Sequence, residues 1–225
     1  MVCLLRILFG GDFSFYNLLS SLLASLILIF IISPMHEMAH GAAAIALGDR
    51  TPKYQGRMTL NPMAHIDWMG ALLIILFGFG WAKPVRVNMF NFKNPKRDMA
   101  ICAAAGPLSN FLFSFIIGIF IYPLLSWAIT GSVMGQIVYF IGQYLIIYSI
   151  YIGLFNLIPI PPLDGSRILS AFLPNRYYYR LMQLERYSFF IIIVLFNLLD
   201  FGAGLSRMTS FLLDKLLILS YMIFG

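Results

Sequence analysis

The chain has 225 residues, of which 60% are hydrophobic and only 11% are charged. Soluble globular domains are closer to half apolar and a quarter charged, so this composition excludes an ordinary soluble domain and indicates an integral membrane protein. The net charge of +6 is explained by basic loops facing anionic lipid, and we expect no nucleic-acid partner. Two cysteines, Cys3 and Cys102, indicate neither a disulfide framework nor a zinc knuckle.

The first predicted membrane span starts near Leu18 and runs through Ile32. It continues as a helix to about Leu47, where Gly48 is a natural stop. About 30 helical residues reach roughly 45 Å, enough to cross a bilayer and extend beyond it. Pro34 is expected to disturb the helix close to its far end.

Residues 69–82 are apolar but too few for a full span, and they contain three glycines. This pattern favours a re-entrant segment or a β-hairpin between the first and second spans. The polar stretches on both sides of it carry basic residues, namely Arg50, Lys53, Arg57, Lys83, Arg86, Lys93, Lys96 and Arg97.

Further apolar runs predict a second span at about 99–123 and a third at about 134–158, which ends in a proline-rich stretch. Two shorter apolar segments follow, at about 187–201 and 208–224, with a glycine-rich turn between them. The predicted fold class is therefore an all-α polytopic membrane protein with about five transmembrane helices. We expect one membrane-embedded domain over residues 1–225.

The distribution of charge predicts the topology. Segments 48–98 and 164–186 are basic, whereas the connection 124–133 carries no charge. If residues 69–82 do not cross the membrane, both basic segments lie on one side, which the positive-inside rule makes cytoplasmic. If those residues did cross, the basic stretches that flank them would be split between the two sides.

The sequence His36-Glu37-Met38-Ala39-His40 lies in the helical continuation of the first span. Residues i and i+4 share a helix face, so the two imidazoles can bind one zinc ion while Glu37 reaches an attacking water. A solvated helix face would be the ordinary alternative in a soluble protein. Here the neighbours are apolar, and ionisable groups buried in a membrane usually serve a function.

A catalytic zinc usually has three protein ligands and one open position. The candidates for the third ligand are His65, Asp67 and Asp164. Asp164 follows the proline-rich end of the third span, where unwound backbone can line a site, although an Asp before Gly is also common in a solvated turn. Asp164 and His40 lie at matching depths on the predicted cytoplasmic side, and this favours Asp164.

Three segments together resemble the signatures of the site-2 protease family, in its small bacterial form without a PDZ domain. They are His36–His40, the Gly106-Pro107-Leu108-Ser109-Asn110 sequence of the second span, and Asn156 through Gly165. The resemblance covers about residues 18–170, which we take as the core, with accessory C-terminal helices at 187–224. It implies one Zn²⁺ per chain bound by His36, His40 and Asp164, with Glu37 as the catalytic acid/base.

The resemblance also implies three substrate-binding residues. Asn110 would hydrogen-bond the substrate carbonyl or its developing oxyanion, although an Asn at that position could instead join two helices. Asn156 could contact substrate or only cap the broken helix. His65 could bind substrate or act as a transient extra ligand, while a lone loop histidine is usually structural.

The implied function is intramembrane zinc endopeptidase activity on single-span membrane proteins, as in regulated intramembrane proteolysis. A sheet-like element near residues 52–95 could hold the unwound substrate as an added strand. The alternatives are a non-catalytic zinc-binding membrane protein, against which Glu37 argues, and a metal transporter, against which the absence of repeated halves argues. We expect the protein in a bacterial cytoplasmic membrane with its site towards the cytoplasm. The sequence does not determine an oligomeric state.

Overall fold

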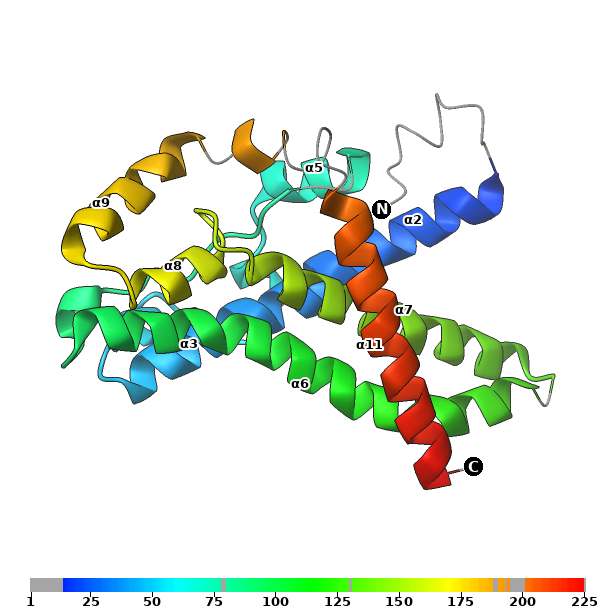
Figure 1. Cartoon of the computed structure of the whole chain (residues 1–225). Coiled ribbons are helices and arrows are strands. Elements are labelled where there is room, and N and C mark those ends of the chain that lie inside the picture. The colour runs from blue at the N-terminus through cyan, green and yellow to red at the C-terminus, as the bar shows by residue number, and fades with distance from the viewer. Residues whose placement is uncertain are drawn as a thin grey trace. The chain divides into compact units, whose positions relative to one another are not determined.

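The computed structural model describes residues 14–77, 80–129, 131–187, 190–192, 194 and 201–224. These residues form two compact units, divided between Asn88 and Met89, and each is described by itself. Within the described ranges the regular structure is entirely helical and no residue is in a β-strand (Figure 1). Among the described residues, three helices are long and apolar enough to cross a membrane: Leu18–Ala46, Pro95–Ile121 and Val133–Asn156. The all-α membrane class is thus confirmed, while a total of five spans stays a prediction.

The first unit is built on one long helix. Helix α2 (Phe15–Ile27) passes through a π-helical turn, η1 (Leu28–Ile32), into α3 (Ser33–Ala46). Pro34 has no N–H, and its ring would crowd the carbonyl of Phe30 in a regular helix. The wider π turn contains Phe30 and ends two residues before Pro34, so it relieves this conflict without ending the helix. The expected disturbance is therefore present immediately before the His-Glu sequence.

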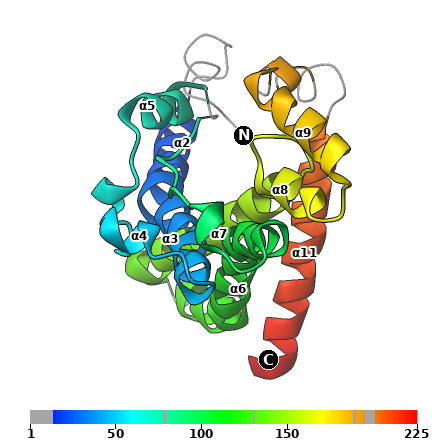
Figure 2. The ribbon, with the colours of Figure 1, turned by 90° about the vertical axis from the view of Figure 1, so that its left-hand side faces the viewer.

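Short elements complete the first unit: α4 (Thr51–Tyr54), the 3₁₀ turn η2 (Pro62–Ala64) and α5 (Trp68–Phe77). Figure 2 shows α2, α3, α4 and α5 together. The β-hairpin considered for residues 69–82 is not found in the described part of that range, most of which is helix α5. Asp67 caps this helix by accepting the N–H of Gly70 at 2.9 Å, a local contact that favours helix over strand. The re-entrant alternative stays a prediction.

Residues 80–88 return beside α5 as irregular chain that belongs to no helix or strand. The sheet-like element expected near 52–95 is therefore also wrong for the described residues. Gly70 permits this return. A Cβ on Gly70 would collide with the carbonyl oxygen of Trp81.

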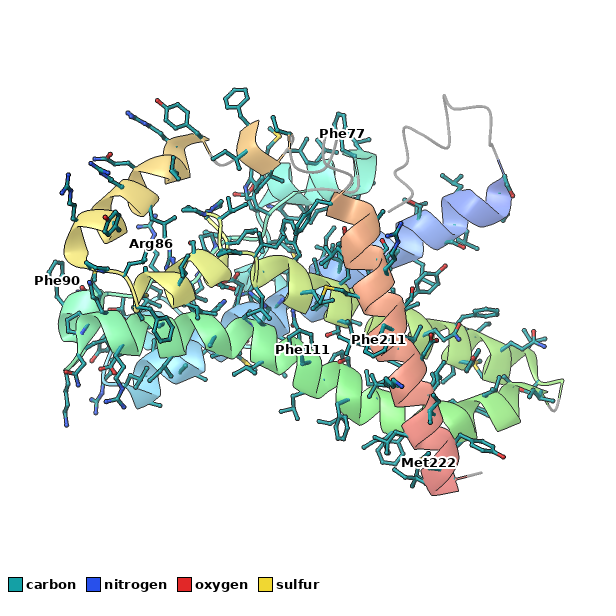
Figure 3. All side chains as sticks on the ribbon, in the orientation of Figure 1. Phe77, Arg86, Phe90, Phe111, Phe211 and Met222 are labelled. Carbon is teal, nitrogen blue, oxygen red and sulfur yellow. The ribbon has the colours of Figure 1, made fainter. Side chains whose placement is uncertain are left out.

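The second unit contains η3 (Met89–Asn91), α6 (Pro95–Ile129), α7 (Val133–Asn156), α8 (Asp164–Ser170), α9 (Asn175–Gln183), η4 (Leu184–Tyr187) and α11 (Phe201–Phe224). Helices α6 and α7 pack against each other, and α11 packs on both. Ile121, Ile146 and Ile150 form a buried cluster between them. Phe111 of α6, labelled in Figure 3, packs against this cluster and against Gly153 of α7.

Two predicted connections differ from the structure. Helix α6 continues to Ile129, so the connection expected at 124–133 is shorter than predicted. The prediction of a glycine-rich turn before residue 208 is wrong, because Gly202 and Gly204 lie inside α11. Glycine lowers helix stability by about 1 kcal/mol, which the packing of a long helix can offset. Most of the apolar segment expected at 187–201 lies outside the described residues.

Candidate metal centre

His36 and His40 lie one turn apart on α3, and both side chains are buried. Their Nε2 atoms are 3.0 Å apart, and the two rings meet edge to face with centroids 4.6 Å apart. Two nitrogen ligands of a tetrahedral zinc ion, each about 2.0–2.1 Å from the metal, lie about 3.3 Å from each other. The paired imidazoles therefore fit two ligands of one zinc ion with little adjustment.

Glu37 is half-buried on the same helix. Its Oε2 accepts a hydrogen bond of 2.8 Å from the backbone N–H of Val85, which belongs to the irregular segment 80–88. The carboxylate is therefore held by a contact far away in the sequence. Sequence reasoning missed this contact, because a backbone donor carries no side-chain signature.

His65 belongs to the first unit and is almost completely buried, with 1% of its surface exposed. Its Nε2 lies 2.9 Å from the carbonyl oxygen of Thr59. A carbonyl only accepts, so Nε2 carries the proton and Nδ1 is left as an acceptor. Nδ1 is buried and has no hydrogen-bond partner among the described residues.

A small cavity in the first unit is bordered by His65, Asp67 and Ser33, together with apolar side chains. Ser33 begins α3 and lies three residues before His36. His65 is thus positioned beside the helix that carries the histidine pair, although its ring nitrogen bonds to the Thr59 carbonyl and not to either histidine.

Asp164 belongs to the second unit, where it is half-buried and forms the first residue of α8. Helix α7 ends at Asn156, and residues 157–163 form irregular turns, so the predicted unwinding at the proline-rich stretch is present. The Pro161–Pro162 peptide bond is cis. Asp164 therefore projects a carboxylate from the end of a non-helical stretch, as a ligand from a broken span would.

The two asparagines also lie in the second unit. Asn110 is completely buried on α6, and its backbone carbonyl accepts a hydrogen bond of 3.0 Å from the Ser149 hydroxyl of α7. Asn156 is half-buried, and its Nδ2 donates to the carbonyl of Ile152 at 3.0 Å. The contact of Asn156 is local to its own helix, which agrees with the capping alternative considered for it.

Comparison with known proteins matches the sequence model of Peptidase family M50 to residues 24–199. "Putative zinc metalloprotease YwhC" of Bacillus subtilis is 39% identical over 188 residues, covering 82% of this chain and 84% of the relative. "Putative zinc metalloprotease MJ0611" of Methanocaldococcus jannaschii is 28% identical and covers 64% and 72%. "Putative zinc metalloprotease Rip2" of Mycolicibacterium smegmatis is 27% identical and covers 72% and 61%.

No solved structure matches the chain. The family match nevertheless includes the His-Glu sequence of α3, the second span and the irregular stretch before Asp164. The names of the relatives specify zinc, and the convergent imidazoles of α3 suit that metal. The chain therefore belongs to peptidase family M50, the site-2 protease family, and is a membrane zinc metalloprotease.

Proposed function

We propose that this protein is an intramembrane endopeptidase that cleaves the transmembrane segments of single-span membrane proteins, as in regulated intramembrane proteolysis. The observation that carries the proposal is the pairing of the His36 and His40 Nε2 atoms, with Glu37 between them, at the end of an apolar helix long enough to span a bilayer. Ionisable groups at such a position are costly in lipid and are retained for function.

In the proposed site Asp164 supplies the third ligand, a carboxylate oxygen that complements the two imidazole nitrogens. Family membership and the irregular backbone before Asp164 support this assignment. A bound zinc ion would polarise the scissile carbonyl and lower the pKa of a water molecule at the open position. Glu37 would take the proton of the attacking water and pass it to the leaving amine.

The remaining proposed residues act on the substrate. A transmembrane helix shields its own carbonyls, so a substrate must be locally unwound before it can be cut. Asn110 and Asn156 are proposed to hydrogen-bond the unwound backbone, and His65 to contact substrate or to serve as a transient ligand. Segment 80–88 lies outside any helix, so its backbone is proposed to offer hydrogen-bonding groups to the unwound chain.

The proposed orientation places the site near the cytoplasmic face of a bacterial cytoplasmic membrane. It is supported by the basic residues that follow α3 and surround α5, including Arg50, Lys53, Arg57, Lys83 and Arg86. Basic residues in short loops close to the ends of membrane spans are retained on the cytoplasmic side.

The test is zinc analysis of the purified protein, combined with cleavage of a panel of single-span substrates by wild type and Glu37→Gln. The variant keeps the shape of the side chain but cannot accept a proton, so we expect about 10²–10⁴-fold slower cleavage with zinc content unchanged. Equal cleavage by both proteins, or no cleavage of any substrate by the zinc-loaded wild type, would replace the protease proposal with a structural zinc site.

A further inference from the structure

Segment 80–88, which contacts Glu37, is attached to α3 and its C-terminal turn at two points. Val85 donates its N–H to Glu37 at 2.8 Å, and Asn88 donates its N–H to Oδ2 of Asp49 at 2.7 Å. The earlier residue of the segment contacts the earlier residue of the helix, so the segment runs beside α3 in the same direction. Arg86, labelled in Figure 3, marks this segment.

A close approach between the attachments shows that the segment lies on the face of α3 that carries Glu37. Gly41 is one turn after Glu37 and shares its face. A Cβ at Gly41 would lie 3.7 Å from Cγ1 of Val85 and 3.3 Å from Cβ of Pro52. Val85 itself is buried, with 8% of its surface exposed. The apolar packing at Gly41 thus adds to the hydrogen bond at Glu37, but this packing involves no polar group.

Asp49 provides the second polar anchor. It is completely buried and follows Gly48, which has a positive φ of 109° and turns the chain away from α3. Besides the N–H of Asn88, its carboxylate accepts the N–H of Thr51 at 3.0 Å and the Thr51 hydroxyl at 2.5 Å. Hydrogen bonds to an ionised carboxylate are stronger than neutral ones. Asp49 is therefore a rigid attachment for Asn88, held in place by Thr51.

We propose that Asp49 is a positioning residue for catalysis, acting through segment 85–88 on Glu37. The inference rests on the proposed protease function. Asp49 holds Asn88, and because only two residues separate Asn88 from Val85, this contact limits where the N–H of Val85 can lie. That N–H holds Oε2 of Glu37, which sets the plane of the carboxylate that must receive a proton. A displacement of about 1 Å in a reacting group can reduce turnover by about 10²-fold.

The first test is Asp49→Asn, with Asp98→Asn as the matched control. The amide introduced by Asp49→Asn has one acceptor oxygen, so it cannot hold both Thr51 and Asn88. Asp98 is also a buried aspartate that accepts a backbone N–H, from Asn94 at 3.0 Å, but its bond is local to the start of α6. We expect Asp49→Asn to lower kcat about 10–100-fold at unchanged KM and zinc content, and Asp98→Asn to leave kcat within about twofold.

A second variant attacks the same attachment from the other side. Asn88→Pro removes the N–H that Asp49 accepts, so the loss of kcat in Asp49→Asn and Asn88→Pro should not add in the double variant. Additive losses would show that the two residues act separately, and the proposal would be wrong. It would also be wrong if Asp49→Asn lost zinc in proportion to activity, because a structural role would then account for the effect.

Hydrogen–deuterium exchange of the peptide covering residues 81–88 gives a readout that needs no substrate. Asp49→Asn should increase its exchange, whereas Asp98→Asn should not. Unchanged exchange, or faster exchange with wild-type kcat, would overturn the positioning role. If the wild type cleaves nothing, the proposed function has failed and the catalytic role of Asp49 fails with it. The exchange result would then still decide separately whether Asp49 holds the segment.

Discussion

The backbone N–H of Val85 holds the carboxylate of Glu37 through a hydrogen bond of 2.8 Å between residues 48 positions apart. The proposed acid/base is thus positioned by main chain that returns from α5, and not by another residue of its own helix. Glu37 therefore has two separate properties: it can accept a proton, and it anchors segment 80–88.

Substitutions at Glu37 should separate those two properties. Glu37→Gln keeps an acceptor oxygen for Val85, whereas Glu37→Ala removes it. Both variants should lose cleavage, but only Glu37→Ala should increase deuterium exchange in residues 81–88, because only it frees the Val85 N–H. Equal exchange in the two variants would show that the contact does not hold the segment in solution.

The proposed ligand set predicts the zinc content of four variants. Alanine at His36, His40 or Asp164 removes one of three ligands, so each change should weaken zinc binding by more than the roughly 10–100-fold that outer-shell changes cost. His65→Ala should keep most of the zinc, as measured by metal analysis after dialysis. A zinc-free His65 variant beside a zinc-loaded Asp164 variant would identify His65 as the third ligand.

The topology is tested by single cysteines in a background without Cys3 and Cys102. Cysteines replacing Lys53, Lys93 or Tyr178 should react with a membrane-impermeant thiol reagent only from the cytoplasmic side. A cysteine replacing Thr130 should react only from the opposite side, because the connection around it carries no charge. Reaction of positions 53 and 93 from opposite sides would mean that α5 is part of a segment crossing the membrane.

Gly165 controls the position of Asp164. A Cβ at Gly165 would collide with the backbone carbonyl of Leu157, so Gly165→Ala must shift the irregular stretch that carries Asp164. We expect at least about tenfold slower cleavage together with weaker zinc binding. Gly204→Ala is the control, since a Cβ there meets nothing within 4 Å and alanine favours helix. Wild-type zinc affinity in Gly165→Ala would argue against Asp164 as a ligand.

The packing of α7 predicts a ranking of stability losses. Ile146 is completely buried in the cluster with Ile121 and Ile150, so Ile146→Ala leaves a cavity and should cost about 2–5 kcal/mol. Ser149→Ala removes one hydrogen bond to the Asn110 carbonyl, for which membrane proteins average about 0.6 kcal/mol. Unfolding in detergent should therefore show the larger loss for Ile146→Ala. The reverse order would contradict the view that apolar packing stabilises α7 more than this hydrogen bond does.

The sequence by itself determined the features that depend on neighbouring residues. The spacing of His36 and His40 places them on one helix face. The prolines that follow Asn156 cannot continue a regular helix, so α7 ends before them. Apolar runs of sufficient length likewise located the three long spans. Each of these features follows from local sterics, helix geometry or transfer into lipid, so no knowledge of distant contacts was needed.

Tertiary structure decided the features that depend on distant partners. The apolar residues after Asp67 could form helix or strand, and the capped helix α5 formed with Gly70 against the returning chain. The acceptors of the N–H groups of Val85 and Asn88 were equally undetermined, because every non-proline backbone carries the same donor. Only the folded path of residues 80–88 beside α3 identified Glu37 and Asp49 as those acceptors.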